Sequence, residues 1–240
     1  MGADRDHHYA AMPREGRHVG RCEMLLPDDL AGKRVLDVGC RRGKGACKIA
    51  ERVGPAGSVR GVDPSPACIE AARAYARSRG MMDPRGCGDA GSEGAAGVRE
   101  RAARAGRLSF AVAPFEDLRR AGVEDGSVDV VYANSALNLA WDLDAALREI
   151  VRVLAPGGCL HCAGVFAEAP LPDEEARAFG AAGNAFGAAD SLAGFEAAAL
   201  AAGFKRCEIG EPSPIEPDGD DVAPELEGRR FVAAVVRAYA

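Results

Sequence analysis

The 240-residue chain has no apolar run near the ~20 residues that a membrane-spanning helix needs. Its first six residues include three charged ones and lack the apolar segment of an export signal. Asp6 stands where a myristoylation signal needs a hydroxyl. Basic side chains are also few, because 30 Lys and Arg against 36 Asp and Glu give a net charge of -6. This balance disfavours a general nucleic-acid binder. We expect a cytoplasmic protein with neither a membrane nor a nucleic-acid partner.

The sequence also lacks a disulfide framework, although it contains eight cysteines. Their spacing shows no repeat and no export signal precedes them, so we expect free thiols in a reducing compartment. The one Cys-x-x-Cys pair, Cys159 and Cys162, falls in an expected strand. Residues three apart in a strand point to opposite faces, so we expect buried thiols there and no metal site.

What the sequence does contain is an alternation of apolar strands and amphipathic helices. With 48% hydrophobic and 28% charged residues, the composition is that of a globular domain. Strands are expected at 33–39, 58–63, 108–112, 128–133, 159–166, 204–209 and 230–237, and helices at 44–53, 65–78, 98–105, 142–154 and 190–201. This order predicts an α/β fold with a Rossmann-like, doubly wound, mostly parallel seven-stranded sheet.

The rest of the chain shows less periodicity. The expected parts are a lead-in segment over 1–32, a ligand-binding core over 33–166, and a C-terminal elaboration over 167–240 that completes the sheet. A short helix is expected near 22–26. His7, His8 and Tyr9 are expected to be unstructured, although an aromatic residue near the start could instead cover a bound ligand. Residues 80–98 and 212–228 are rich in Gly, Asp or Pro and predict loops, the first of which could cover a site.

A glycine turn follows the first expected strand, with the sequence Asp37-Val38-Gly39-Cys40-Arg41-Arg42-Gly43. In doubly wound sheets, ligands bind at the carboxyl ends of the strands. Gly39 and Gly43 allow a close approach of the backbone, and the amides at the start of the next helix favour a polar or anionic group. Asp63 ends the second strand, where it can accept hydrogen bonds from both hydroxyls of a ribose.

Two details of this turn separate the possible ligands. The dinucleotide fingerprint G-x-G-x-x-G places its second glycine at position 41, where this chain has Arg41. Asp37 would repel a pyrophosphate but suits a ligand with an ammonium group. An NAD-type oxidoreductase is therefore disfavoured. Arg41, Arg42 and Lys44 either form a solvated basic rim, or Arg41 contacts a carboxylate of the ligand or an anionic substrate.

These residues resemble a known family. Val35 to Cys40 with Gly43, then Gly61-Val62-Asp63, look like the first two motifs of class I S-adenosylmethionine (SAM)-dependent methyltransferases. Segments 115–118, 127–131 and 147–158 are similar to later motifs in the same order, so the resemblance covers about 33–166. It implies SAM as the cofactor and a small-molecule methyl acceptor. The cofactor-binding positions that it implies are Asp37, Gly39, Cys40, Arg41, Gly43, Asp63, Pro64, Phe115, Glu116 and Asn134.

Within these motifs, some roles stay open. Glu116 or Asp117 either lies near the adenine amino group or is a surface acid. Asn134 either ends its strand or faces the reactive methyl group, and it is our first candidate catalytic residue. No general base stands out, which favours an acceptor that is soft or already nucleophilic.

A narrower resemblance, to the arsenite methyltransferase branch, extends to about residue 204. The similar segments are 134–139, 165–167, 171–172 and 183–188. That branch holds the metalloid on thiolates, and its cysteines fall here on Ala46, Ser135 and Ala185. Cys47 lies one place beyond the first and is the second candidate catalytic residue. Because these thiols are shifted or absent, a SAM-binding module without turnover is the alternative to an enzyme.

Overall fold

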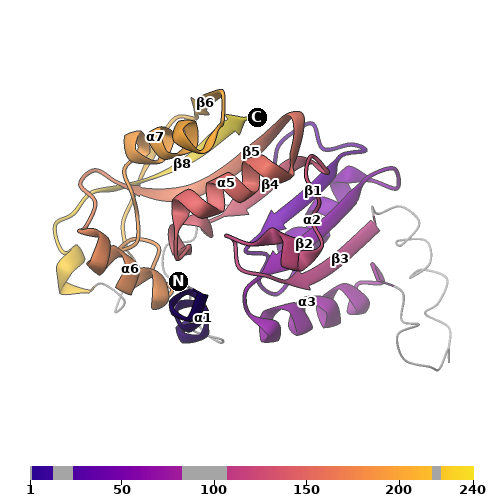
Figure 1. The fold of residues 1–240 in the computed structure, drawn as a ribbon, viewed down its shortest axis with the longest axis horizontal. Coiled ribbons are helices and arrows are strands. Elements are labelled where there is room, and N and C mark those ends of the chain that lie inside the picture. The colour runs from indigo at the N-terminus through magenta and orange to yellow at the C-terminus, as the bar shows by residue number, and fades with distance from the viewer. Residues whose placement is uncertain (1, 13–23, 83–106, 218–222) are drawn as a thin grey trace.

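The computed structural model describes residues 2–12, 24–82, 107–217 and 223–240 (Figure 1). Its strands form one sheet in the order β3-β2-β1-β4-β5-β8-β6, with β7 also paired to β8. Their bounds are β1 Arg34–Val38, β2 Ser58–Asp63, β3 Arg107–Val112, β4 Val128–Asn134, β5 Leu154–Ala167, β6 Arg206–Ile209, β7 Ser213–Ile215 and β8 Phe231–Tyr239. The expected α/β sheet is confirmed, with one strand more than the seven predicted.

The five strands from β3 to β5 are parallel, and β8 runs antiparallel to β5 and to β6 and β7. The carboxyl ends of β1, β2, β3 and β4 therefore lie along one edge of the sheet. That edge carries the glycine turn after β1, Asp63 at the end of β2 and Asn134 at the end of β4. The topology thus brings three separate predicted segments together.

Helices cover both faces of the sheet. Their bounds are α1 Gly2–Ala11, α2 Lys44–Val53, α3 Pro66–Ser78, α5 Leu143–Val153, α6 Asp173–Ala181 and α7 Leu192–Ala202, with 3₁₀ turns η1 Leu118–Ala121, η2 Leu137–Leu139 and η4 Pro224–Leu226. α2 and α3 bury Ile49 and Ile69 against one face. α5 and α7 bury Leu147, Ile150 and Phe195 against the other, over β4, β5 and β8 (Figure 1).

Side-chain caps explain where several helices begin. The Ser65 hydroxyl accepts a hydrogen bond from the amide of Cys68, and the Asp142 carboxylate accepts one from Ala145. Each cap satisfies an amide that the first helical turn leaves without a partner. α5 ends at Val153, and a bulge at Pro156-Gly157-Gly158 then lets β5 pair with β4, with Leu154 opposite Val128 and Cys159 opposite Val130.

Several expectations are corrected outside the core. Residues 2–11 form α1, in which His8 and Tyr9 are buried, so they are not unstructured. Residues 24–26 of the expected helix near 22–26 are not helical. The expected helix at 98–105 and most of the loop at 80–98 lie outside the described residues.

The C-terminal part contains two further corrections. α6 was not predicted, because Gly180 is its one buried residue and no apolar stripe marks it. The expected loop at 212–228 contains β7 and η4, since Ile215 and the buried Leu226 pack with Phe231 in a small core of their own. Every helix in the described ranges is too short or too polar to cross a bilayer.

Candidate functional site

The turn between β1 and α2 is fixed to the end of β2. The amides of Gly39 and Cys40 donate to the carbonyl of Val62 over 2.8 and 3.1 Å. Gly39 and Gly43 have φ angles of 74° and 73°, and Arg41 has a φ of 49°. Arg41 thus occupies the left-handed region that favours glycine. This agrees with its place in the turn, where the dinucleotide fingerprint has its second glycine.

Gly39 also makes a close approach to the segment after β4. A Cβ atom on Gly39 would lie 2.4 Å from the Cβ of Ala136 and 3.6 Å from the ring of Phe115. Real Cβ atoms do not approach that closely, so the site requires glycine here. The turn after β1 and the chain after β4 are therefore packed directly against each other at this edge of the sheet.

Asp37 lies beneath this turn and is 4% exposed. Its Oδ2 is buried and has no hydrogen-bond partner among the described residues. Burial, together with the charge of Asp63, raises the pKa of Asp37 to about 8. A buried carboxylate without a counter-charge is costly, and a cation placed beside it would remove that cost.

Asp63 stands at the end of β2, as predicted, and is 6% exposed. Its Oδ2 accepts a hydrogen bond from the amide of Arg41 and its Oδ1 accepts one from the amide of Ser65, each over 2.9 Å. Burial raises the pKa of Asp63, whereas the two amides favour its charged form. The carboxylate is held in one orientation and has further acceptor capacity on both oxygens.

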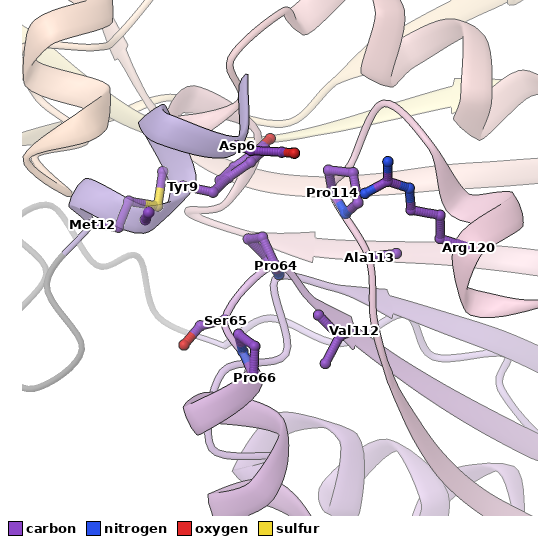
Figure 2. Close-up of a pocket in the computed structure, with 11 residues that line it drawn as sticks. Asp6, Tyr9, Met12, Pro64, Ser65, Pro66, Val112, Ala113, Pro114 and Arg120 are labelled. Atoms are coloured by element: carbon purple, nitrogen blue, oxygen red, sulfur yellow. The ribbon is translucent and has the colours of Figure 1, made fainter. Parts of the chain in front are cut away.

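A pocket of about 230 Å³ opens beside Asp63, between α1 and the carboxyl ends of β2 and β3. Figure 2 shows Pro64, Ser65 and Pro66 on one side, Val112 to Pro114 on another, and Asp6, Tyr9 and Met12 facing them. Val112 is a large apolar residue that is 40% exposed in this pocket. The walls suit a flat, largely apolar group.

Tyr9 and Glu116 connect α1 to the core next to this pocket. The Tyr9 hydroxyl donates to Glu116 Oε1 over 2.8 Å, and the amide of Asp142 donates to the same oxygen over 3.1 Å. Burial raises the pKa of Tyr9 far above its usual range. Its ring meets Phe115 edge-on at 5.5 Å. Glu116 Oε2 is buried with no partner in the described part of the chain.

Asn134 and Ser135 end β4 at the same edge. The Ser135 hydroxyl donates to Asn134 Oδ1 over 3.4 Å, and Ser135 has a φ of 52°. Sequence reasoning missed Asn138, whose amide donates to the carbonyls of Val165 and Ala185 over 2.7 and 3.2 Å. Asn138 thereby ties the end of β5 to the segment after α6. The signal that could have identified Asn138 is its place in segment 134–139, which resembles the arsenite methyltransferase branch.

The thiols of Cys40 and Cys47 lie in apolar surroundings. Cys47 is buried in the core between α2 and the sheet, and burial raises its pKa to about 11. Burial also raises the pKa of Cys40, which lies in the same core. Ala46 and Ala185 are buried as well. Cys47 is thus protonated at neutral pH, which weakens its candidacy as a substrate thiolate.

Cys159 and Cys162 pack on opposite faces of β5, as expected. Within the described ranges, no cluster of three or more His, Cys, Asp or Glu side chains could hold a metal ion.

Known proteins match this chain over most of its length. A family model described as a methyltransferase domain matches residues 36–162. An arsenite methyltransferase of Aquipseudomonas alcaligenes is 32% identical over 225 residues, which are 93% of this chain and 58% of that protein. An arsenite methyltransferase of Mus musculus is 27% identical over 158 residues, 66% of this chain and 37% of that protein.

Among solved structures, an arsenic(III) SAM methyltransferase from Chlamydomonas reinhardtii has a TM-score of 0.71 and 30% identity, covering 92% of this chain and 67% of that one. The chain spans 58% and 37% of the two curated relatives. These proteins therefore contain long segments with no counterpart in this sequence.

Proposed function

Because the chain belongs to the class I SAM-dependent methyltransferases, with SAM as cofactor, we propose that it catalyses methyl transfer to a small-molecule acceptor. The single observation that carries the proposal is the buried, unpartnered Oδ2 of Asp37 beneath the glycine turn. SAM carries an ammonium group, a ribose and an adenine, and supplies an activated methyl group on a sulfonium centre. The described residues offer a partner for each of the three binding groups.

A feature of the described residues supports each binding role that we propose. Asp37 would hold the ammonium group, because a cation there compensates its buried charge. Asp63 would accept hydrogen bonds from the ribose hydroxyls, since backbone amides already fix its orientation. The pocket beside Pro64 and Val112 would hold the adenine. We propose that α1 excludes water from this pocket and that Tyr9 orients Glu116 at its rim.

The protein's contribution to the reaction is alignment. Holding donor and acceptor in line can lower a barrier by about 7–11 kcal/mol, without a general base. Asn134 stands at the carboxyl end of β4, where its side chain can orient the acceptor. We assign the choice of acceptor to residues 167–240, which form α6, α7 and the strands beyond β5.

We further propose that the acceptor is soft or already nucleophilic, with arsenite as one candidate. The relatives named as arsenite methyltransferases support that candidate. The residues at Ala46, Ser135 and Ala185 cannot supply thiolates, and Cys47 is protonated at neutral pH. These positions therefore lack the thiolates that hold the metalloid in the branch that the sequence resembles, and small thiols and phenols are the other candidate acceptors. The free cysteines among the described residues support a reducing compartment such as the cytoplasm.

Thermal unfolding with SAM, and separately with NAD, tests the cofactor assignment. A ligand at about 100 times its dissociation constant adds about 2.7 kcal/mol of stability. SAM should stabilise the wild type and NAD should not. Asp63→Ala should abolish the effect, whereas Asp29→Asn should retain it, because Asp29 is exposed and precedes β1 at the opposite edge. An unchanged response in Asp63→Ala would contradict the site.

Turnover is tested by consumption of radiolabelled SAM with arsenite, small thiols and small phenols as acceptors. Transfer to any of them that is lost in Asp63→Ala supports the enzyme. SAM binding without transfer to any acceptor would favour the binding module instead.

A further inference from the structure

One face of the sheet has no α-helix over the amino ends of β1, β2 and β3, among the residues that the structure describes. α2 and α3 cover the opposite face, where Val35, Val59 and Leu108 point. Parallel strands that are covered on both faces consist of nearly continuous apolar runs. β2 and β3 instead alternate apolar and polar residues, with the polar side chains toward the open face.

The strand register places these polar residues in two rows. Arg34, Ser58 and Arg107 are direct neighbours across β1, β2 and β3. In the next row on the same face, Arg60 lies opposite Ser109. Adjacent strands are about 4.8 Å apart, so three arginines share a small area of one face. Like charges at such positions repel each other unless a counter-charge lies between them.

The counter-charges on this face are incomplete. Arg34 is paired with Asp129 over 2.6 Å. Arg60 is anchored by neutral groups, because its Nη1 donates to the carbonyls of Ala121 and Gly122 over 2.6 and 2.9 Å. Those bonds fix the guanidinium without neutralising it.

Arg107 is exposed and forms no ion pair within the described ranges. Among the described residues that line the groove over this face, Glu124 is the one carboxylate. Beyond the pair of Arg34 with Asp129, two arginines therefore face one acid.

A groove of about 390 Å³ lies over these residues, bounded by the loop from Gly122 to Ser127. We propose that it binds a small molecule that carries a phosphate group, with the phosphate between Arg60 and Arg107. Guanidinium groups match phosphate oxygens in geometry, and Ser58 and Ser109 add hydroxyl donors. The volume exceeds that of a phosphate alone and leaves room for an organic part.

This groove is separate from the proposed cofactor site. It lies at the amino ends of the strands, whereas Asp37, Asp63 and the pocket beside α1 lie toward the carboxyl ends. The two pockets share no lining residue, so binding in the groove can be measured without SAM.

Calorimetric titration of the full chain at low ionic strength tests the proposal, with pyrophosphate and uridine diphosphate as probes. At least one probe should bind at one site, and Arg107→Gln should weaken that binding about tenfold, as expected for one charge-assisted contact. Arg148→Gln removes an exposed arginine on α5 and should leave the affinity unchanged. Stronger binding of uridine diphosphate than of pyrophosphate would identify the phosphate as part of a larger molecule.

Arg60→Gln should weaken binding as well, but it also removes the bonds to η1. Arg107→Gln keeps the test valid if the Arg60 variant does not fold, and its melting temperature should match the wild type. The proposal is overturned if neither probe binds, if Arg107→Gln binds as tightly as the wild type, or if Arg148→Gln loses as much affinity.

Discussion

Replacing Asp37 by asparagine should stabilise the free protein and remove cofactor binding. In the folded chain the pKa of Asp37 is about 8, against 3.8 for an ordinary aspartate. Between these values the unfolded chain ionises while the folded chain keeps the proton. The contribution of Asp37 to the free energy of unfolding is therefore highest below pH 3.8, and falls by about 1.36 kcal/mol per pH unit until pH 8.

At pH 7 this loss amounts to about 4 kcal/mol, because pH 7 lies roughly three units above the ordinary pKa. Asp37→Asn removes the loss, but its amide N–H groups need partners in the same buried place, at about 1–3 kcal/mol. The net gain in the free energy of unfolding is about 1–3 kcal/mol at pH 7. Near pH 4 the gain disappears and Asp37→Asn should be the less stable chain, because ionisation of Asp37 in the unfolded chain then costs the wild type less than about 1 kcal/mol, whereas the cost of the buried amide remains.

Urea unfolding of the wild type and Asp37→Asn at pH 4 and pH 7, without SAM, measures this gain. Asp129→Asn is a control of opposite sign, because Arg34 lowers the pKa of Asp129 and the variant should lose up to about 1 kcal/mol at pH 7. Calorimetry should show no SAM binding to Asp37→Asn. If Asp37→Asn is less stable than the wild type at pH 7, Asp37 is already compensated in the free protein and the argument for a cation site fails.

Three further predictions concern the same site. Between pH 6 and 7.5, SAM affinity should rise up to tenfold per pH unit, because the ammonium group needs an ionised Asp37 and binding therefore releases one proton. Calorimetry in two buffers measures this proton release, and pH-independent binding would refute the prediction. Gly39→Ala should lower the free energy of unfolding in urea by several kcal/mol and abolish SAM binding. Gly126→Ala has a similar φ but open space around it, so it should lower the free energy of unfolding by only about 1–2 kcal/mol, and equal losses would exclude a clash at Gly39. Tyr9→Phe should loosen α1 by about 1.5–3 kcal/mol. The ring of Trp141, the sole tryptophan, lies 5.4 Å from the ring of His8 on α1, so the fluorescence of Trp141 should change in this variant. An unaltered spectrum together with unaltered SAM affinity would contradict the role of Tyr9.

The central elements were predictable because local signals agree with the tertiary structure. α2 begins and ends at the expected residues, 44 and 53, since Gly43 and Gly54 flank it and its apolar stripe faces the sheet. β2 also has its expected bounds, 58–63, because a turn precedes it and Asp63 ends its apolar run. Chain order and parallel pairing then place the carboxyl ends at one edge.

The parts that could not be predicted depend on contacts between residues far apart in the chain. His8 bonds to the carbonyl of Leu139, 131 positions away, and Tyr9 bonds to Glu116, 107 positions away. α1 has only a modest apolar face that would mark it in isolation. α1 packs on α6 and bonds to η2 through His8, and periodicity in residues 2–11 does not encode either contact.

The environment of Asp37 argues for a bound ligand. Its neighbours in β1, Val35, Leu36 and Val38, are buried apolar residues that favour folding whatever occupies position 37. A structural carboxylate at this depth would have a cation or several N–H donors around it, as Asp63 has. Asp37 Oδ2 has neither within the described ranges. A chain under selection for stability alone would replace such a residue, whereas retention of a costly carboxylate beside a turn that requires glycine is expected where binding offsets the cost.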